Sequence, residues 1–405
     1  MTPTTLAGEA ARTTDTKVIT LVSAAHFVSH YYILVLPPLF PLIRDEFGVS
    51  YIELGAALTA FNVISAAMQT PAGFLVDRVS ARAMLIGGLL LGAGALAGAS
   101  LVTSFWMFVA MFALLGLANT AYHPADYALL SHRVSAPGMS KAYSIHTFSG
   151  ILGSAVAPAT LLFLAASFGW RGAFLGAAAL GLAAAALLML GGDAIAGRDE
   201  PPAKTAAEKV AADGESTWRL LLTPAILLNL VFFIMLSLAN GGVQNYSVVA
   251  LEALRGTPLA VANIALSAYL LMSAIGVLAG GYAAARTSRH DGIVIAALAA
   301  NAFAVLAIAF FDVAAPLLIL LMSAAGLFQG LAMPSRDMLV RAVTPSGSFG
   351  KVFGFVTTGF NIAGMVAPLI FGWLMDQGHP QAVLLASAAF ALATIPTVMA
   401  TVARR

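Results

Sequence analysis

Long apolar runs separated by short charged loops fill almost the whole sequence. A helix of about 20 apolar residues crosses the hydrocarbon core of a bilayer while satisfying its own backbone hydrogen bonds. Of the 405 residues, 60% are hydrophobic and only 9% are charged, too few charges for the surface of a soluble protein of this length. The pattern therefore predicts an all-α membrane protein whose main partner is the lipid bilayer.

Apolar runs bounded by charges and turn residues define the predicted membrane spans. We expect twelve transmembrane helices, at residues 18–42, 53–76, 83–102, 105–131, 141–166, 171–191, 218–247, 258–284, 292–311, 314–341, 350–375 and 381–402. The first run is too long for the core of a cleavable signal peptide, so we expect it to be retained.

One stretch of the chain occurs twice. Five positions of the first copy recur 210 positions later in the second, and the pairs are Gly116 and Gly326, Pro124 and Pro334, Lys141 and Lys351, Thr147 and Thr357, and Pro158 and Pro368. A repeat separated by half the chain predicts two pseudo-symmetric six-helix bundles. We divide the chain into a tail (1–17), a first bundle (18–191), a polar linker (192–217) and a second bundle (218–405).

Lysine and arginine are distributed unevenly among the loops. With the N-terminus inside, sixteen of the 20 basic residues fall in cytoplasmic segments, and only Arg44, Arg171 and Arg255 fall outside. Such an excess marks the cytoplasmic side. We therefore expect an integral protein of the inner membrane with both termini in the cytoplasm.

Charge and cysteine content exclude several classes of protein. The net charge of +2 gives no basis for a nucleic-acid partner. The absence of cysteine excludes disulfides and thiolate metal sites. No soluble phosphate-binding loop accompanies the glycine-rich spans, which argues against a pump driven by ATP. The sequence predicts no cofactor and no metal.

The loop between the second and third spans holds Gly73, Asp77, Arg78 and Arg82. This pattern resembles the cytoplasmic loop signature of the major facilitator superfamily. The resemblance implies the major facilitator fold, a monomer, and a gating loop in which Asp77 latches the two halves together. Gly73 would let two helices approach closely. The alternative is a positively charged loop with an incidental acid.

A closer resemblance, from about Ala25 to Pro158, is to the fosmidomycin-resistance family of that superfamily. It is carried by His26, the run 36–42, the run 45–50, Gln69, and Tyr122-His123-Pro124. The resemblance implies proton-driven drug export. Three features depart from this pattern: His30 replaces an aspartate, Phe112 replaces the arginine of many antiporters, and the glycine-rich antiporter motif is missing after Val156.

Ionisable residues in the predicted spans are costly, at about 2.5 kcal/mol or more each at a helix centre, and usually face a cavity or one another. His26 and His30 share one face of the first span; His123 and Asp126 share a face of the fourth. We predict Asp126 and His123 as the proton-coupling pair, with His26 and His30 close by. Each histidine could instead be a structural helix contact, and Asp126 a structural cap. His146 we interpret as a membrane-surface residue.

In the repeat, the positions equivalent to Asn119, His123 and Asp126 are Gln329, Met333 and Arg336, so an acid in one half corresponds to a base in the other. Arg336 could bind an anionic or zwitterionic substrate, form an ion pair with Asp126 that opens on binding, or pair locally with Asp337. In the seventh span, adjacent glycines at 241 and 242 weaken the helix, and unwound backbone there would line a cavity. The predicted substrate contacts are Arg336, Asn119, Gln329, Asn240, Gln244 and Tyr31.

The pattern favours a secondary active transporter, not an enzyme, that moves a small polar, anionic or zwitterionic compound by alternating access coupled to protons. The family resemblance implies that the direction is export. Proton-linked uptake of an organic anion is the alternative. Two remote alternatives remain: an intramembrane metalloenzyme using His26, His30, His123 and Asp126, and a sensor that binds without transport. No motif identifies the substrate.

Overall fold

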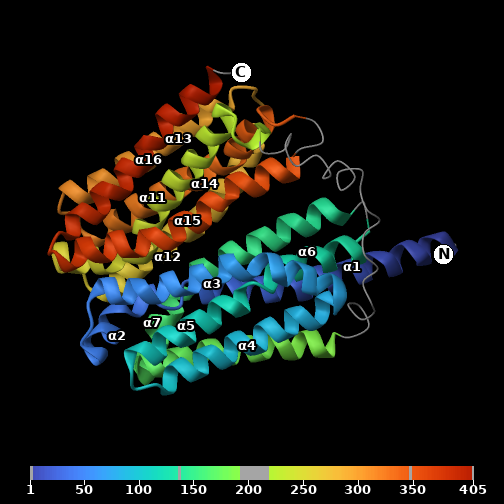
Figure 1. Ribbon diagram of the computed structural model, residues 1–405, viewed down its shortest axis with the longest axis horizontal. Coiled ribbons are helices and arrows are strands. Elements are labelled where there is room, and N and C mark those ends of the chain that lie inside the picture. Colours follow the sequence, from blue (N-terminus) through green and yellow to red (C-terminus); the bar gives the residue numbers. More distant parts are fainter. Residues whose placement is uncertain (1–2, 136–137, 192–218, 346–348, 404–405) are drawn as a thin grey trace. The chain divides into compact units, whose positions relative to one another are not determined.

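A computed structural model describes residues 3–135, 138–191, 219–345 and 349–403, and these are built from helices without any strand (Figure 1). The all-α fold class is thus confirmed. The first part of the chain contains α1 (Pro3–Ile33), the 3-10 helix η1 (Pro37–Leu39), α2 (Phe40–Phe47), α3 (Tyr51–Arg78), α4 (Ala81–Leu101), α5 (Phe105–Asn119), α6 (Tyr122–Arg133) and α7 (Met139–Leu190). The second part contains α11 (Pro224–Arg255), α12 (Leu259–Ala284), α13 (His290–Phe310), α14 (Ala315–Ala342), α15 (Phe349–Asp376) and α16 (Pro380–Val402).

Within the described ranges, eleven helical segments are long and apolar enough to cross a membrane. The number of segments is eleven and not the predicted twelve because α7, which has 52 residues, contains both the fifth and the sixth predicted spans. Gly169 interrupts this helix with φ 68° and ψ 171°. A straight helix of that length would measure about 78 Å, far more than the roughly 30 Å core of a bilayer. The break therefore makes two span-length helices of α7.

The first and fourth predicted spans are each divided by a local break. In the first, the chain leaves α1 at Ile33, and Pro37 and Pro38 open η1 before α2. At the other end, α1 begins at Pro3 and runs through most of the predicted N-terminal tail. In the fourth, α5 ends at Asn119 and α6 begins at Tyr122. Proline explains both breaks, because it lacks the N–H needed to continue a helix.

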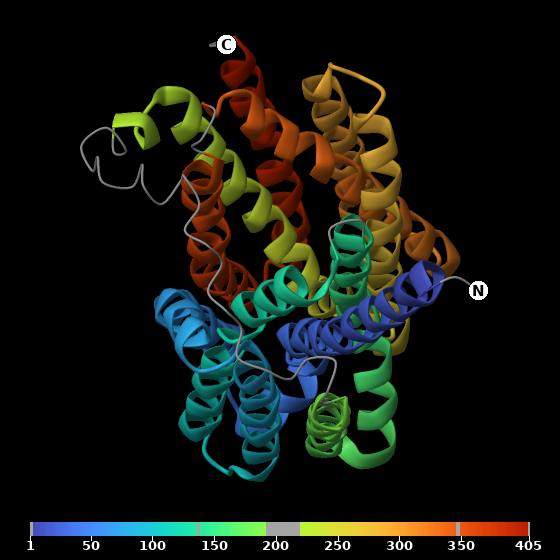
Figure 2. The same cartoon turned by 90° about the vertical axis from the view of Figure 1, so that its right-hand side faces the viewer.

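The chain divides into two compact units. Unit 1 comprises residues 1–48 and 60–202, and unit 2 comprises residues 49–59 and 203–405. In unit 1, α7 packs against α1 and α4, and α4 also packs against α5. In unit 2, α12 packs against α14, and α11 packs against α15 and α16; Figure 2 shows these helices in colours from yellow-green to red. The start of α3 belongs to unit 2, where the Asp376 carboxylate accepts hydrogen bonds from the N–H groups of Tyr51 and Ile52 at 2.7 and 2.8 Å.

Small residues allow the closest helix contacts in both units. In unit 1, a Cβ on Gly153 of α7 would collide with the backbone oxygen of Phe27 in α1. In unit 2, a Cβ on Gly326 of α14 would collide with the backbone oxygen of Tyr269 in α12. Helix association in lipid depends on such close packing, because lipid chains are as apolar as the side chains they would replace.

Candidate functional site

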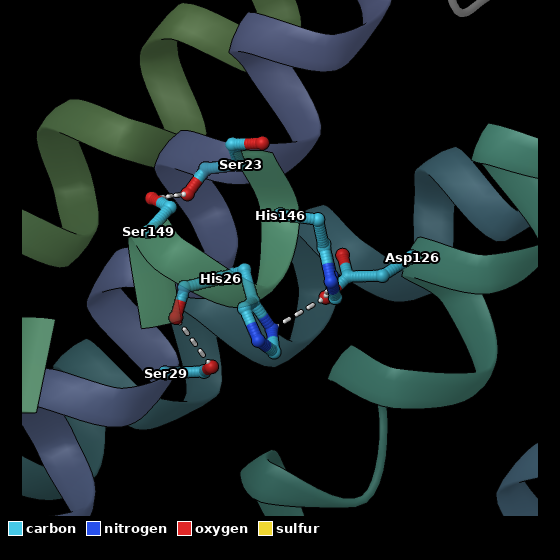
Figure 3. Close-up of polar contacts among 6 residues, drawn as sticks. All are labelled: Ser23, His26, Ser29, Asp126, His146 and Ser149. Carbon is cyan, nitrogen blue, oxygen red and sulfur yellow. Dashed lines mark hydrogen bonds and ion pairs between the residues drawn. The ribbon is translucent and has the colours of Figure 1, made fainter. Parts of the chain in front are cut away.

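A buried carboxylate lies between two histidines at the centre of unit 1 (Figure 3). The Asp126 side chain on α6 is fully buried, and its Oδ2 lies 3.1 Å from Nδ1 of His26 on α1. The same oxygen lies 3.1 Å from Nε2 of His146 on α7. The two imidazole rings stack, with ring centroids 3.6 Å apart. Three helices from distant parts of the sequence thus bring an acid and two bases into direct contact.

Two further histidines surround this core. The ring of His30 lies 4.6 Å from that of His26, and the ring of His123 lies 5.3 Å from it, measured between centroids. We refer to His26, His30, His123, Asp126 and His146 as the His–Asp cluster. The structure thus places the first-span histidines close to His123 and Asp126. The roles of these residues remain predictions.

The break between α5 and α6 positions His123 and Asp126. Pro124 cannot donate a hydrogen bond, and the chain tightens at this point, where the N–H groups of Thr120 and Ala121 bond to oxygens only three residues back. The new helix then carries His123 and Asp126 three residues apart on one face. Asp126 is therefore not the structural cap that one interpretation of the sequence allowed, because it lies inside α6 and contacts imidazoles.

Close packing of α7 on α1 shapes the other wall of the cluster. A Cβ on Gly150 would lie 2.6 Å from His26 Nε2 and 2.9 Å from His30 Cδ2, so only glycine leaves room for the two rings. The same helices are joined by Ser149, whose hydroxyl donates to the Ser23 backbone oxygen at 2.6 Å (Figure 3). The Ser29 hydroxyl donates to the backbone oxygen of His26.

His146 is the site residue that sequence reasoning missed. The interpretation as a membrane-surface residue is wrong, because the side chain is 1% exposed and contacts Asp126. A signal was present in the sequence. His146 shares a helix face with the small residues Gly150, Gly153 and Ala157, and such a face indicates close packing against another helix.

Tyr31 and Asn119 lie in unit 1, but each has a partner other than the His–Asp cluster. The Tyr31 hydroxyl lies 2.9 Å from the Thr160 hydroxyl. The Asn119 amide donates to the Ser65 hydroxyl at 2.8 Å. Both side chains are therefore tied to neighbouring helices in this structure.

Arg336 of unit 2 pairs with its neighbour in sequence, as one interpretation of the sequence allowed. Its Nε donates to Asp337 Oδ1 at 2.9 Å. The guanidinium carbon also lies 4.8 Å from the ring centroid of Phe233 and 5.6 Å from that of Phe360, distances suited to cation–π attraction. The Arg336 side chain is 12% exposed, against 48% for Asp337. The more exposed Asp337 carboxylate can therefore move into water more readily than the Arg336 guanidinium can. An anionic ligand could then take its place beside Arg336.

The other predicted contacts in unit 2 differ in their surroundings. Gln329 on α14 is buried, and its Nε2 has no hydrogen-bond partner in the described structure. The side-chain amide oxygen of Asn240 on α11 accepts a hydrogen bond from the Tyr269 hydroxyl at 3.2 Å. Gln244 is half-buried on the same helix, one turn further on. Gln329 is thus a buried polar group with unused hydrogen-bonding capacity in the described structure.

The expected unwinding of the seventh span is wrong. The helix α11 runs without a break from Pro224 to Arg255. Both glycines have packing roles instead: a Cβ on Gly242 would collide with the Ser387 hydroxyl, and one on Gly241 would lie 2.9 Å from the Ala367 Cβ. The glycine pair reflects close contact with α15 and α16, not loss of helical structure.

The predicted gating loop is only partly described. Arg82 donates from Nη2 to the backbone oxygens of Leu188 and Met189 at the end of α7, at 3.3 and 2.9 Å. Among the residues that the structure describes, none lies within 4 Å of where a Cβ on Gly73 would be, and the close helix approach expected there stays a prediction. The side chains of Asp77 and Arg78 lie outside the described part of the structure.

Comparisons with known proteins define the class to which this chain belongs. Residues 22–257 and 230–405 match the Major Facilitator Superfamily. The chain is a member of that family, as the loop signature indicated.

Curated relatives are transporters within the same family. A probable sulfoacetate transporter of Cupriavidus necator is 26% identical over 365 residues, which cover 83% of this chain and 82% of the relative. The fosmidomycin resistance protein of Escherichia coli is 23% identical over 171 residues, 41% of this chain and 42% of the relative. A probable L-galactonate transporter of Escherichia coli is 28% identical over 140 residues, 35% of this chain and 31% of the relative.

Solved structures share the fold. A bacterial homologue of the human lysosomal transporter Spinster has a TM-score of 0.78 at 14% identity, covering 96% of this chain and 98% of the other. The nucleoside transporter NupG has a TM-score of 0.75 at 15% identity, again covering 96% and 98% of the two chains. Because the family and the named neighbours are transporters, this chain is a membrane transporter and not an enzyme.

Proposed function

We propose that the protein is a secondary active transporter that exports a small anionic or zwitterionic compound by alternating access, in exchange for protons. The observation that carries this proposal is the fully buried Asp126 carboxylate in contact with two imidazoles. A carboxylate and histidines can exchange protons in the physiological range of pH, and ionisable groups at membrane depth usually belong to such a pathway.

Asp126 and His123 form the proposed proton-coupling pair, with His26 and His30 as near neighbours. The contacts also favour His146 as a direct partner of the acid, since it lies as close to Asp126 Oδ2 as His26 does. A proton taken up at Oδ2 of Asp126 would occupy one of its lone pairs, so that one of the two imidazole N–H contacts would be lost. Loss of that contact would loosen the packing of α1 and α7 around α6, which links proton binding to helix movement.

Arg336 forms the proposed anion-binding group of unit 2. It lies between two aromatic rings and is paired with the half-exposed Asp337, which an incoming carboxylate, sulfonate or phosphonate could displace. Gln329, Asn240 and Gln244 are the accompanying uncharged contacts proposed in unit 2, and Asn119 and Tyr31 are the contacts proposed in unit 1. The names of the relatives, which mention sulfoacetate, galactonate and fosmidomycin, support an anionic substrate.

The proton role is tested by reconstitution. Asp126→Asn in proteoliposomes is expected to abolish flux driven by a pH gradient, because the amide cannot take up and release the proton. Asp312→Asn, at an exposed acid, is the matched control and is expected to transport as the unaltered protein does. Full transport by the Asp126→Asn protein would remove this residue from the mechanism.

The substrate is found by a thermal-shift screen over organic anions, amino acids and antibiotics, followed by flux measurement on the compounds that stabilise the protein. Arg336→Gln is expected to lose the stabilisation by anionic compounds, because the amide cannot form a charge-assisted pair. Equal stabilisation of both proteins would argue against Arg336 as the anion site. Stabilisation with no flux in either direction would favour a sensor.

Proton-linked uptake of an organic anion is the second candidate. The absence of the antiporter motifs from this sequence favours it, and the relative described as a probable sulfoacetate transporter supports an organic anion as the cargo. The direction of the pH gradient that drives cargo flux in proteoliposomes distinguishes the two. In export by exchange, protons and cargo cross the membrane in opposite directions, whereas in proton-linked uptake both cross in the same direction.

The proposal places both termini in the cytoplasm and the protein in the inner membrane. The loop at residues 73–82 would act as the cytoplasmic gate, with Asp77 and Arg78 forming the latch. A monomer would suffice, since the proposed contacts come from one chain, and light scattering in detergent would test this.

A further inference from the structure

We infer that the His–Asp cluster of unit 1 is a binding site for a divalent transition-metal ion such as Zn²⁺. One ligand atom each from His26, Asp126 and His146 lies within 4.8 Å of the others, and all three side chains are buried. The spacing of these residues in the sequence gave no metal motif, because the three ligands come from three separate helices. The inference goes beyond proton-driven transport and departs from the expectation that the chain has no metal site.

The distances suit a small metal ion. Ligands at about 2.1 Å from a tetrahedral Zn²⁺ are separated from one another by about 3.4 Å. The two nitrogen–oxygen distances at Asp126 are each 3.1 Å, a few tenths of an ångström short of this separation, and no two of the three ligand atoms are more than 4.8 Å apart. Glycine at position 150 of α7 leaves room for the His26 ring, because a Cβ there would lie 2.6 Å from His26 Nε2.

The hydrogen bonding of the cluster is incomplete in a way that an ion would correct. Both imidazoles contact Oδ2 of Asp126, while Oδ1 is buried without a hydrogen-bond partner in the described structure. Nδ1 of His123, three residues away on the same helix, is likewise buried without one. Buried polar atoms are nearly always paired, and leaving one unpaired costs about 1–3 kcal/mol. A bound cation would give these atoms a partner.

The donor set indicates which ions would bind. Imidazole nitrogens with a single carboxylate suit Zn²⁺, Co²⁺ and Ni²⁺, whereas Mg²⁺ and Ca²⁺ require mostly oxygen ligands. His26, Asp126 and His146 would supply three ligands, and His123 is placed to become the fourth. The carboxylate provides the negative charge that partly balances the ion inside the apolar bundle.

Equilibrium binding to the purified full-length protein tests the inference. The protein is prepared with an affinity tag free of histidine, stripped with a chelator and titrated with Zn²⁺ by calorimetry and with Co²⁺ by visible absorption. We expect one ion per chain. We expect His146→Ala and Asp126→Asn each to weaken binding at least about tenfold, and His290→Ala, which removes a histidine of unit 2, to leave it unchanged.

Absence of stoichiometric binding by the unaltered protein would overturn the inference. So would equal binding by the unaltered protein and both cluster variants. If a variant fails to fold, X-ray absorption on the ion bound to the unaltered protein decides instead, since two or more imidazole ligands are expected and none would exclude this site. Binding is measured without a gradient, so its failure is distinguishable from a failure of proton-driven transport.

Discussion

Asp126 makes both of its imidazole contacts through one oxygen, and one of the contacting rings, that of His26, packs against Gly150. The three-helix meeting point has room for His26 and His30 only because residue 150 lacks a side chain. Position 150 therefore controls the geometry of the acid without touching it.

A methyl group at this position tests that control. Gly150→Ala is expected to push the His26 and His30 rings away from Asp126 and to lower proton-driven flux about tenfold or more, since displacements near 1 Å can cost far more than that at a reacting site. Gly94→Ala, where a Cβ meets nothing within 4 Å, is the control and should transport normally. Equal flux in the two variants would show that the ring positions are unimportant.

The residues of the His–Asp cluster illustrate what sequence could and could not provide. Spacing along one helix correctly placed His26 with His30 and His123 with Asp126, because helical geometry determines which side chains share a face. His146 was missed because its role depends on which helix packs against α7, and that is decided by tertiary contacts. The same limit applies to Gly241 and Gly242. The low helix propensity of glycine predicted unwinding there, but packing against α15 and α16 keeps the helix intact.

At the scale of elements, apolar periodicity predicted the helices well and their interruptions less well. The ends of α4 and α12 fall within two residues of the predicted spans. The first predicted span divides near Ile33, and α7 joins two predicted spans. Interruptions depend on single prolines and glycines, and hydropathy averaged over a window of many residues does not register a single residue.

The interruption at Gly169 carries a stability prediction. Its φ of 68° combined with ψ of 171° belongs to a region that is essentially restricted to glycine. Gly169→Ala is expected to destabilise the protein by about 1–3 kcal/mol and to lower the thermal unfolding midpoint in detergent. Gly94→Ala is again the control, because it lies in a regular helix with open space around it. An unchanged midpoint for Gly169→Ala would show that the turn accepts other residues.

At the scale of the whole molecule, membrane orientation follows from loop charge. The absence of cysteine makes single-cysteine labelling direct. In intact cells, a membrane-impermeant maleimide is expected to label Gln377→Cys, after α15, and to label Ser288→Cys, between α12 and α13, only after permeabilisation. The reason is the excess of basic residues in the loops assigned to the inside, including Arg286 and Arg289 beside Ser288. The reverse labelling pattern would invert the proposed topology and place both termini outside.

The 210-residue offset pairs Asp126 with Arg336 and His123 with Met333, so the two copies of the repeat carry different chemistry at equivalent positions. No member of the His–Asp cluster lies in residues 219–403, and Arg336 with its aromatic neighbours lies wholly within them. Substitutions around Arg336 can therefore accumulate without disturbing the buried acid. Under the proposed function, this separation would let descendants acquire new cargoes while the proton-coupling site stays unchanged.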